Sequence, residues 1–210
     1  RDFAFTSSRK FIWDAMQVDV EGKKVWAMSY YSKEGNPLWE KYSTMAVAHT
    51  LKSYSKRTIA YPYPVAISCH ATLGGGMEYP NVTVIGSSGN ERTLETVIMH
   101  EVGHNWFFGM IGSNETYRAA LDEGFTQFLT AWCMRKLTKE NQPELKRAFS
   151  GYMEDALDGT DESLETHSNE FHSATGHGGG YKHVYYKTAS MLYNLQYTLG
   201  DSVFLQAMKD

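Results

Sequence analysis

The fold of this chain is decided by residues 97–123, which read VIMHEVGHNWFFGMIGSNETYRAALDE. Residues four apart on a helix lie about 40° apart around its axis, so His100 and His104 project from one face and can hold a single ion. Glu101 rotates to the flank of that face, where it can reach a water on the metal. Catalytic zinc takes three protein ligands, and Glu123, separated from His104 by eighteen residues, is the candidate third ligand. We interpret the stretch as a zinc site with Glu101 as the candidate base.

The surroundings of this motif decide its meaning, because a bare His-Glu-x-x-His pattern also occurs on solvated helix faces. Residues 91–111 carry recurrent apolar side chains, and Ser88 with Glu91 has the capping-box pattern of a helix start. A second periodic segment, 121–137, places Glu123 in the first turn of a helix that can pack against the first. We therefore expect the three ligands to converge from two helices.

The zinc motif resembles that of the gluzincin metallopeptidases of peptidase clan MA, and more narrowly that of the aminopeptidase N and leukotriene hydrolase family. Two more segments agree with the family's ordered motifs: residues 75–79, Gly-Gly-Met-Glu-Tyr, and residues 185–187, Tyr-Tyr-Lys. The resemblance covers essentially the whole chain. It implies an α+β fold, a thermolysin-like metallopeptidase domain. In that fold a small mixed β-sheet has an edge strand that lines the cleft, and a mainly helical half carries the zinc site.

The resemblance also implies roles for individual residues. The family's matching glutamate, Glu78 here, grips the free α-amine of the substrate. The matching tyrosine, Tyr185, donates its hydroxyl to the developing oxyanion, with Tyr186 as the local competitor. The segment expected to bind substrate comprises Gly75, Gly76, Met77 and Glu78. Local sequence by itself favours a glycine-rich turn with Glu78 in solvent, so the role of Glu78 depends on the resemblance.

Four positions depart from the family pattern. Tyr79 and Asp122 each replace a common Asn, Thr130 replaces a common Glu, and Thr188 replaces the usual Gly. Metal-bound histidines donate their second ring N–H to a carboxylate or carbonyl. Because Thr130 replaces the glutamate, another group must accept this hydrogen bond. These departures indicate a divergent branch.

The rest of the chain divides into a sheet-rich part, 1–90, and a helical part, 91–210, within a single catalytic domain that we expect to be a fragment of a longer protein. Alternating or β-branched runs predict strands at 3–5, 11–13, 25–28, 65–69 and 82–85. Helical periodicity predicts further helices at 36–56, 143–157, 181–199 and after Asp201. We expect the polar loop 159–180 to form a wall of the cleft. The alternative is a second metal site through His167, His172 and His177.

Composition bounds the remaining possibilities. With 210 residues, 42% of them hydrophobic, the chain is long enough for one well-buried domain. The net charge of −4 provides no basic surface for nucleic acid, and no apolar run approaches the roughly 20 residues of a membrane span. Cys69 and Cys133 lack metal or redox spacing and are expected to be buried free thiols. The sequence does not indicate a compartment.

The function expected from these residues is that of an aminopeptidase with one zinc ion per chain. It would hydrolyse the first bond of a peptide with a free N-terminus, beside other domains of the parent chain. Two alternatives stay open: another zinc hydrolase on the same scaffold, either an endopeptidase or an epoxide hydrolase, and a non-catalytic scaffold relative.

Overall fold

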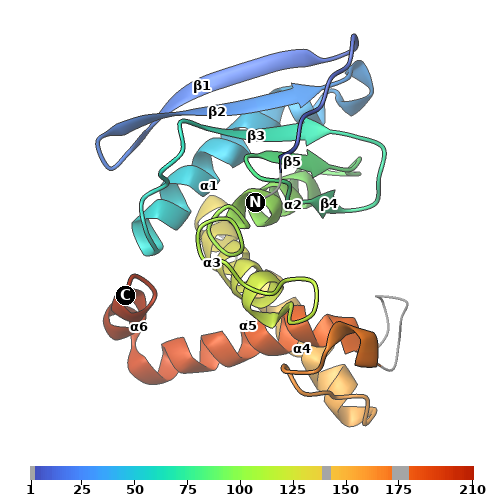
Figure 1. Cartoon of the computed structure of the whole chain (residues 1–210), viewed down its shortest axis with the longest axis vertical. Helices are drawn as coiled ribbons and strands as arrows, with labels where there is room; N and C mark the ends of the chain where they lie inside the picture. Colours follow the sequence, from blue (N-terminus) through green and yellow to red (C-terminus); the bar gives the residue numbers. More distant parts are fainter. Residues whose placement is uncertain (1–2, 139–142, 172–179) are drawn as a thin grey trace. The chain divides into compact units, whose positions relative to one another are not determined.

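The computed structural model describes residues 3–138, 143–171 and 180–210 of the chain (Figure 1). The chain divides into two compact units, Arg1–Trp106 and Phe107–Asp210, which are described in turn. The expectation that the whole chain is one catalytic domain stays a prediction.

A five-stranded mixed sheet forms the first unit, in the order β1-β2-β3-β5-β4. Its strands are β1 (Ile12–Val20), β2 (Lys23–Tyr31), β3 (Val65–His70), β4 (Gly76–Met77) and β5 (Val82–Ile85). The hairpin β1–β2 and the pair β4–β5 are antiparallel, while β2, β3 and β5 run parallel. The short strand β4 therefore lies at one edge of the sheet, with one side of its backbone unpaired within the sheet.

One face of the sheet packs against the helices α1 (Thr44–Arg57) and α2 (Glu91–Gly103) (Figure 1). The alternation along β2 explains this, because Val25, Ala27, Ser29 and Tyr31 are buried while the residues between them are not. The chain enters α1 through a 3-10 turn, η1 (Lys33–Gly35), and a π-helical turn, η2 (Trp39–Ser43). The buried residues of β2 thus lie on the face of the sheet that the helices cover.

The second unit is helical in the residues that the structure describes. Its elements are η3 (Ala120–Gly124), α3 (Phe125–Thr138), α4 (Pro143–Leu157), η4 (Ser168–Glu170), α5 (Gly180–Leu199) and α6 (Asp201–Ala207). Phe128, Trp132 and Phe204 form an aromatic cluster between α3 and α6, with ring centroids 5.4–6.0 Å apart. None of the described helices is long and apolar enough to cross a membrane.

The predicted fold class is confirmed, and three details of the prediction are wrong. Residues 3–5 form no strand, and Phe3 and Phe5 are exposed rather than packed on the sheet. The zinc-motif helix begins at Asn90 as N-cap, whose side chain accepts a hydrogen bond from the Thr93 amide, and not at Ser88. It ends at Gly103, well before residue 111, and Phe108 adopts a positive φ of 88° that a helix cannot contain. Cys69 and Cys133 are buried free thiols, as expected.

Candidate metal centre

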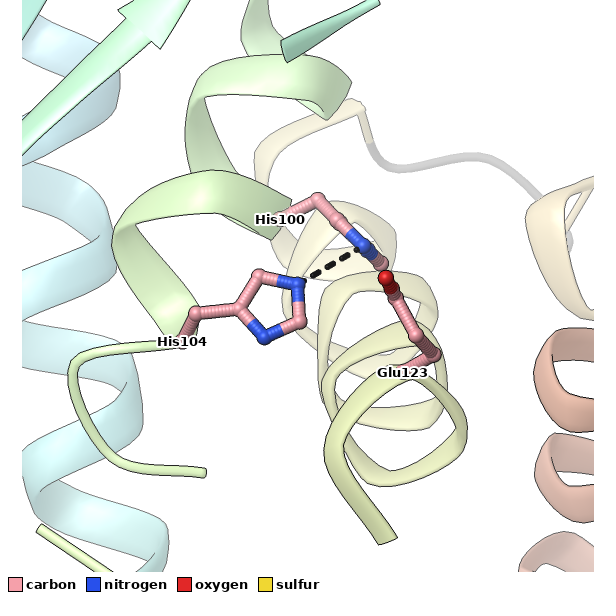
Figure 2. Close-up of side chains that lie close together, drawn as sticks. All are labelled: His100, His104 and Glu123. Carbon is pink, nitrogen blue, oxygen red and sulfur yellow. Dashed lines mark hydrogen bonds between the residues drawn. The ribbon is translucent and has the colours of Figure 1, made fainter. Parts of the chain in front are cut away.

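The last turn of α2 holds the two histidines of the motif. Although the helix ends at Gly103, His104 keeps a helical backbone conformation, and its amide donates to the His100 carbonyl over 3.3 Å. The two imidazole rings therefore stay one turn apart on the same face, with their centroids 4.8 Å apart and their planes at 83°. Their Nε2 atoms face each other at 3.2 Å (Figure 2).

This separation fits a shared zinc ion. Two nitrogens bound tetrahedrally at about 2.0–2.1 Å from zinc would lie roughly 3.3–3.4 Å apart, close to the distance between the two Nε2 atoms. Ligand atoms of His100, His104 and the Glu123 carboxylate all lie within 4.8 Å of one another (Figure 2). Two imidazole nitrogens and one carboxylate oxygen are a donor set that zinc takes in catalytic sites.

Glu123 lies in η3, the π-helical turn that precedes α3, and only 8% of its surface is exposed. The turn is packed directly on α5, because a Cβ added to Gly124 would lie 2.3 Å from the Thr188 Cβ. Single π-helical turns are rare and are often found at functional sites, since they redirect a side chain that an α-helix would aim elsewhere. Gly124, the neighbour of Glu123, thus leaves room for Thr188, which stands where the resembled family usually has glycine.

Glu101 lies against the backbone of the edge strand. A Cβ added to Gly76 would lie 2.4 Å from Glu101 Cγ and 2.6 Å from its Oε1, closer than real atoms approach. Because glycine has no Cβ, position 76 leaves room for the Glu101 side chain next to the backbone of β4. Glu101 is itself 8% exposed, so the carboxylate is held in a largely buried place next to the histidines.

Glu78 follows the edge strand and lies in the same cluster. Ligand-type oxygen or nitrogen atoms of Glu78, Glu101 and His104 all lie within 4.8 Å of one another. The segment 79–81 is fixed by Asn105, which directly follows His104 and is 5% exposed. Its side-chain oxygen accepts from the Asn81 amide at 3.0 Å, and its side-chain nitrogen donates to the Val102 carbonyl at 2.9 Å.

Asn105 was missed by the sequence analysis. A polar residue after the zinc motif gives no sign of its partner, because the bond to Asn81 joins residues 24 positions apart. Tyr79, which stands where the resembled family commonly has Asn, is 45% exposed and begins the segment that Asn105 fixes.

Tyr185 and Tyr186, the two candidates for the oxyanion donor, are both half-buried on α5. Tyr186 packs on α4, because a Cβ added to Gly151 would lie 2.6 Å from its ring. The contact gives Tyr186 a structural role between α4 and α5.

The loop histidines are placed only in part. His167 stacks on Tyr117 at 4.6 Å and accepts a hydrogen bond from the Asn169 amide. Among the described residues, no group of three metal-ligand side chains includes it. His172 and His177 lie outside the described residues, as does much of the segment expected to wall the cleft.

Glu95 is a buried carboxyl on α2 with a shifted pKa. It is 7% exposed and lies more than one turn before His100. Burial, reinforced by the nearby Glu91 carboxylate, raises the pKa of Glu95 to about 7. Its protonation therefore changes near neutral pH in the folded chain.

Comparison with known proteins identifies the family. Residues 42–210 match the profile of the Peptidase family M1 domain. The chain belongs to this family. The resemblance to gluzincin peptidases of the aminopeptidase N type is confirmed, and the solved structures below are an M1 zinc metallopeptidase and an aminopeptidase.

Solved structures share the fold at low identity. An M1 zinc metallopeptidase from Deinococcus radiodurans matches 94% of this chain and 42% of its own, at 19% identity and a TM-score of 0.73. A mutant of that type of enzyme, bound to the substrate Tyr-Ser-Ala, matches at 18% identity, with 94% and 43% covered and a TM-score of 0.71. Legionella pneumophila aminopeptidase A in complex with aspartic acid matches at 14% identity, with 94% and 23% covered and a TM-score of 0.61. The chain thus spans less than half the length of these M1 proteins.

Proposed function

We propose that this chain is the catalytic part of a zinc aminopeptidase, which removes the first residue of peptides with a free N-terminus. The observation that carries the proposal is the convergence of two carboxylates, Glu78 and Glu101, on a histidine of the zinc motif. One carboxylate serves as a base, and the second binds a positive charge. The matching mutant from D. radiodurans, bound to a tripeptide, supports peptide as the substrate class.

We propose that His100, His104 and Glu123 hold one zinc ion per chain, since their donor atoms and spacing fit that ion. When bound, zinc polarises a carbonyl and lowers the pKa of its water to near neutrality. Glu101 accepts a proton from the attacking water and returns it to the leaving amine. Its position against Gly76 keeps the carboxylate near the substrate-binding edge strand.

Glu78 determines which bond is cut. An extended peptide can pair with the free edge of β4, and a carboxylate directly after that strand can hold the substrate ammonium. Tyr185 donates its hydroxyl to the oxyanion, a role whose removal typically lowers the rate by about two to three orders of magnitude. Further domains of the parent chain complete the enzyme, as the greater length of the relatives suggests.

The proposal is tested by hydrolysis of amino-acid amides and of their N-acetylated counterparts, with bound metal quantified in the same sample. We expect zinc-dependent cleavage of the free amines, abolished by chelation and restored by zinc, and far slower cleavage of the acetylated amides. Equal cleavage of both would indicate an endopeptidase, cleavage of an epoxide alone would indicate the epoxide-opening class, and stoichiometric zinc without any hydrolysis would indicate a scaffold.

A further inference from the structure

Residues 160–162 contact α5 at two positions, one before and one after Tyr185 in the sequence. His183, two residues before it, is 1% exposed, and its Nε2 lies 2.9 Å from the Thr160 carbonyl oxygen. The Glu162 amide lies 3.1 Å from the same nitrogen. A ring nitrogen either donates or accepts, so the tautomer decides which contact is the hydrogen bond, and both keep the ring against this loop.

Lys187, two residues after Tyr185, binds the same loop. Its ammonium donates to both oxygens of the Asp161 carboxylate, at 2.8 and 2.9 Å, and to the Glu162 carbonyl at 2.8 Å. The two side chains are only 23% and 33% exposed, so this ion pair is partly shielded from water. The ammonium also lies 5.8 Å from the centre of the Tyr152 ring of α4.

Asp161 joins the two contacts. Its Oδ1 lies 3.7 Å from His183 Nδ1, and the buried Asp155 carboxylate of α4 lies 3.6 Å from the same nitrogen. Asp161 therefore lies beside the imidazole and the ammonium at once. Rotation or sliding of α5 would break both contacts.

Helix geometry places this network behind Tyr185. Residues 183 and 187 lie about 40° apart around the axis, and residue 185 lies roughly opposite to both. Thr188 lies on the side of Tyr185, about 60° away, and packs against Gly124 in the turn that carries Glu123. The helix is thus held from behind by residues 160–162 and from the front by η3.

We propose that His183, Asp161 and Lys187 form a clamp that positions the Tyr185 hydroxyl for its role as oxyanion donor, an inference that rests on the proposed function. These three are positioning residues, since they act through Tyr185. The clamp fixes the helix from the side opposite to Tyr185.

The test uses the variants Lys187→Met and Asp161→Asn in the unmodified chain and in a Tyr185→Phe background, with kcat, KM and zinc content measured for each. We expect each variant to lower kcat by about 10- to 100-fold in the unmodified chain, with KM changed less than about twofold, because misplacement of a catalytic group by about 1 Å has that cost. In the Tyr185→Phe background neither should lower kcat further. Lys187→Arg keeps the charge, and its guanidinium can pair with the Asp161 carboxylate through two N–H groups, so it should recover part of the loss that Lys187→Met shows.

Lys24→Met is the matched control, since it breaks the exposed pair with Asp19 at 3.3 Å and should leave kcat unchanged. Equal losses in both backgrounds, a rise in KM alone, or an unchanged kcat for Lys187→Met would overturn the clamp.

A second measurement does not depend on activity. Amide hydrogen exchange of the metal-free protein should be faster at residues 160–162 and 184–188 in Asp161→Asn, and unchanged in α1. Unchanged exchange at residues 160–162 would overturn the clamp. If the unmodified chain cleaved no amide, the proposed function would fail, and this exchange measurement would still decide whether the clamp holds α5.

Discussion

Substitution of Gly76 by alanine tests whether the edge strand sets the position of the base. The added Cβ would lie 2.4 Å from Glu101 Cγ and 2.6 Å from its Cδ, whereas carbon atoms in contact lie about 3.5 Å apart or more. The Glu101 side chain must therefore move by about 1 Å. Misplacement of a catalytic group by that distance costs roughly 100-fold in rate, or about 2.7 kcal/mol in activation free energy.

The same clash should cost little stability. The atoms that Cβ meets belong to a side chain and not to backbone, so the Glu101 side chain can move while the strand stays in place. We expect a loss near the lower end of the roughly 1–3 kcal/mol that overpacking costs, and unchanged zinc content. Gly74→Ala is the matched control, because a Cβ there meets nothing within 4 Å.

The assay is kcat/KM on a chromogenic amino-acid amide, with thermal unfolding and metal content measured on the same preparations. Gly76→Ala should lose about 100-fold while Gly74→Ala keeps normal activity. In a Glu101→Gln background, which should retain zinc but lose nearly all hydrolysis, Gly76→Ala should have no further effect. Equal activity of the two alanine variants would mean that Gly76 does not set the position of Glu101 or that Glu101 is not the base.

Three further predictions concern the metal, the substrate and pH. His104→Ala should lower bound zinc from one equivalent to near zero by metal analysis, and equal zinc in both proteins would contradict the ligand assignment. Glu78→Gln should lower kcat/KM on free-amine peptides by roughly two decades but leave the slow cleavage of N-acetylated peptides nearly unchanged; equal losses on both would mean that Glu78 binds no ammonium. The folded pKa of Glu95 is about 7, above its usual 4.5, so its contribution to stability is full below pH 4.5 and is lost as pH rises through 7. Thermal melts at pH 5.5 and 8.5 should show that Glu95→Gln removes this part of the decline, and parallel declines in both proteins would contradict it.

Sequence patterns predicted those parts of the site that depend on short spacing. His100 and His104 need only one helical turn, and their Nε2 atoms lie 3.2 Å apart although the helix ends much earlier than predicted. The strand runs at β3 and β5 were found for the same reason, because alternation and β-branching are local signals. The edge strand at Gly76 was expected from the family resemblance.

The contacts that aim the side chains could not be predicted. Asn105 reaches Asn81, and Lys187 reaches Asp161, across 24 and 26 positions. Nothing in the local sequence distinguishes these polar residues from solvated ones, since only the fold brings each pair together. The end of the zinc-motif helix was missed for a similar reason, because Asn105 binds backbone and a distant turn instead of continuing the helical pattern.

Three glycines in or near the site allow close contacts between elements that the sequence motifs do not reveal. Gly76 lies against Glu101, Gly103 lies 2.7 Å, measured from an added Cβ, from the Tyr54 ring, and Gly124 lies against Thr188. None of the three has the positive φ that would require glycine in a turn, so the missing side chain itself is what each position needs. Each glycine is next to Glu101, His104 or Glu123 in space or in sequence, and each lets a second element approach at backbone distance. From the sequence alone, such glycines would be interpreted as turns or helix ends. In this fold they set how closely the elements carrying Glu101, His104 and Glu123 approach their neighbours.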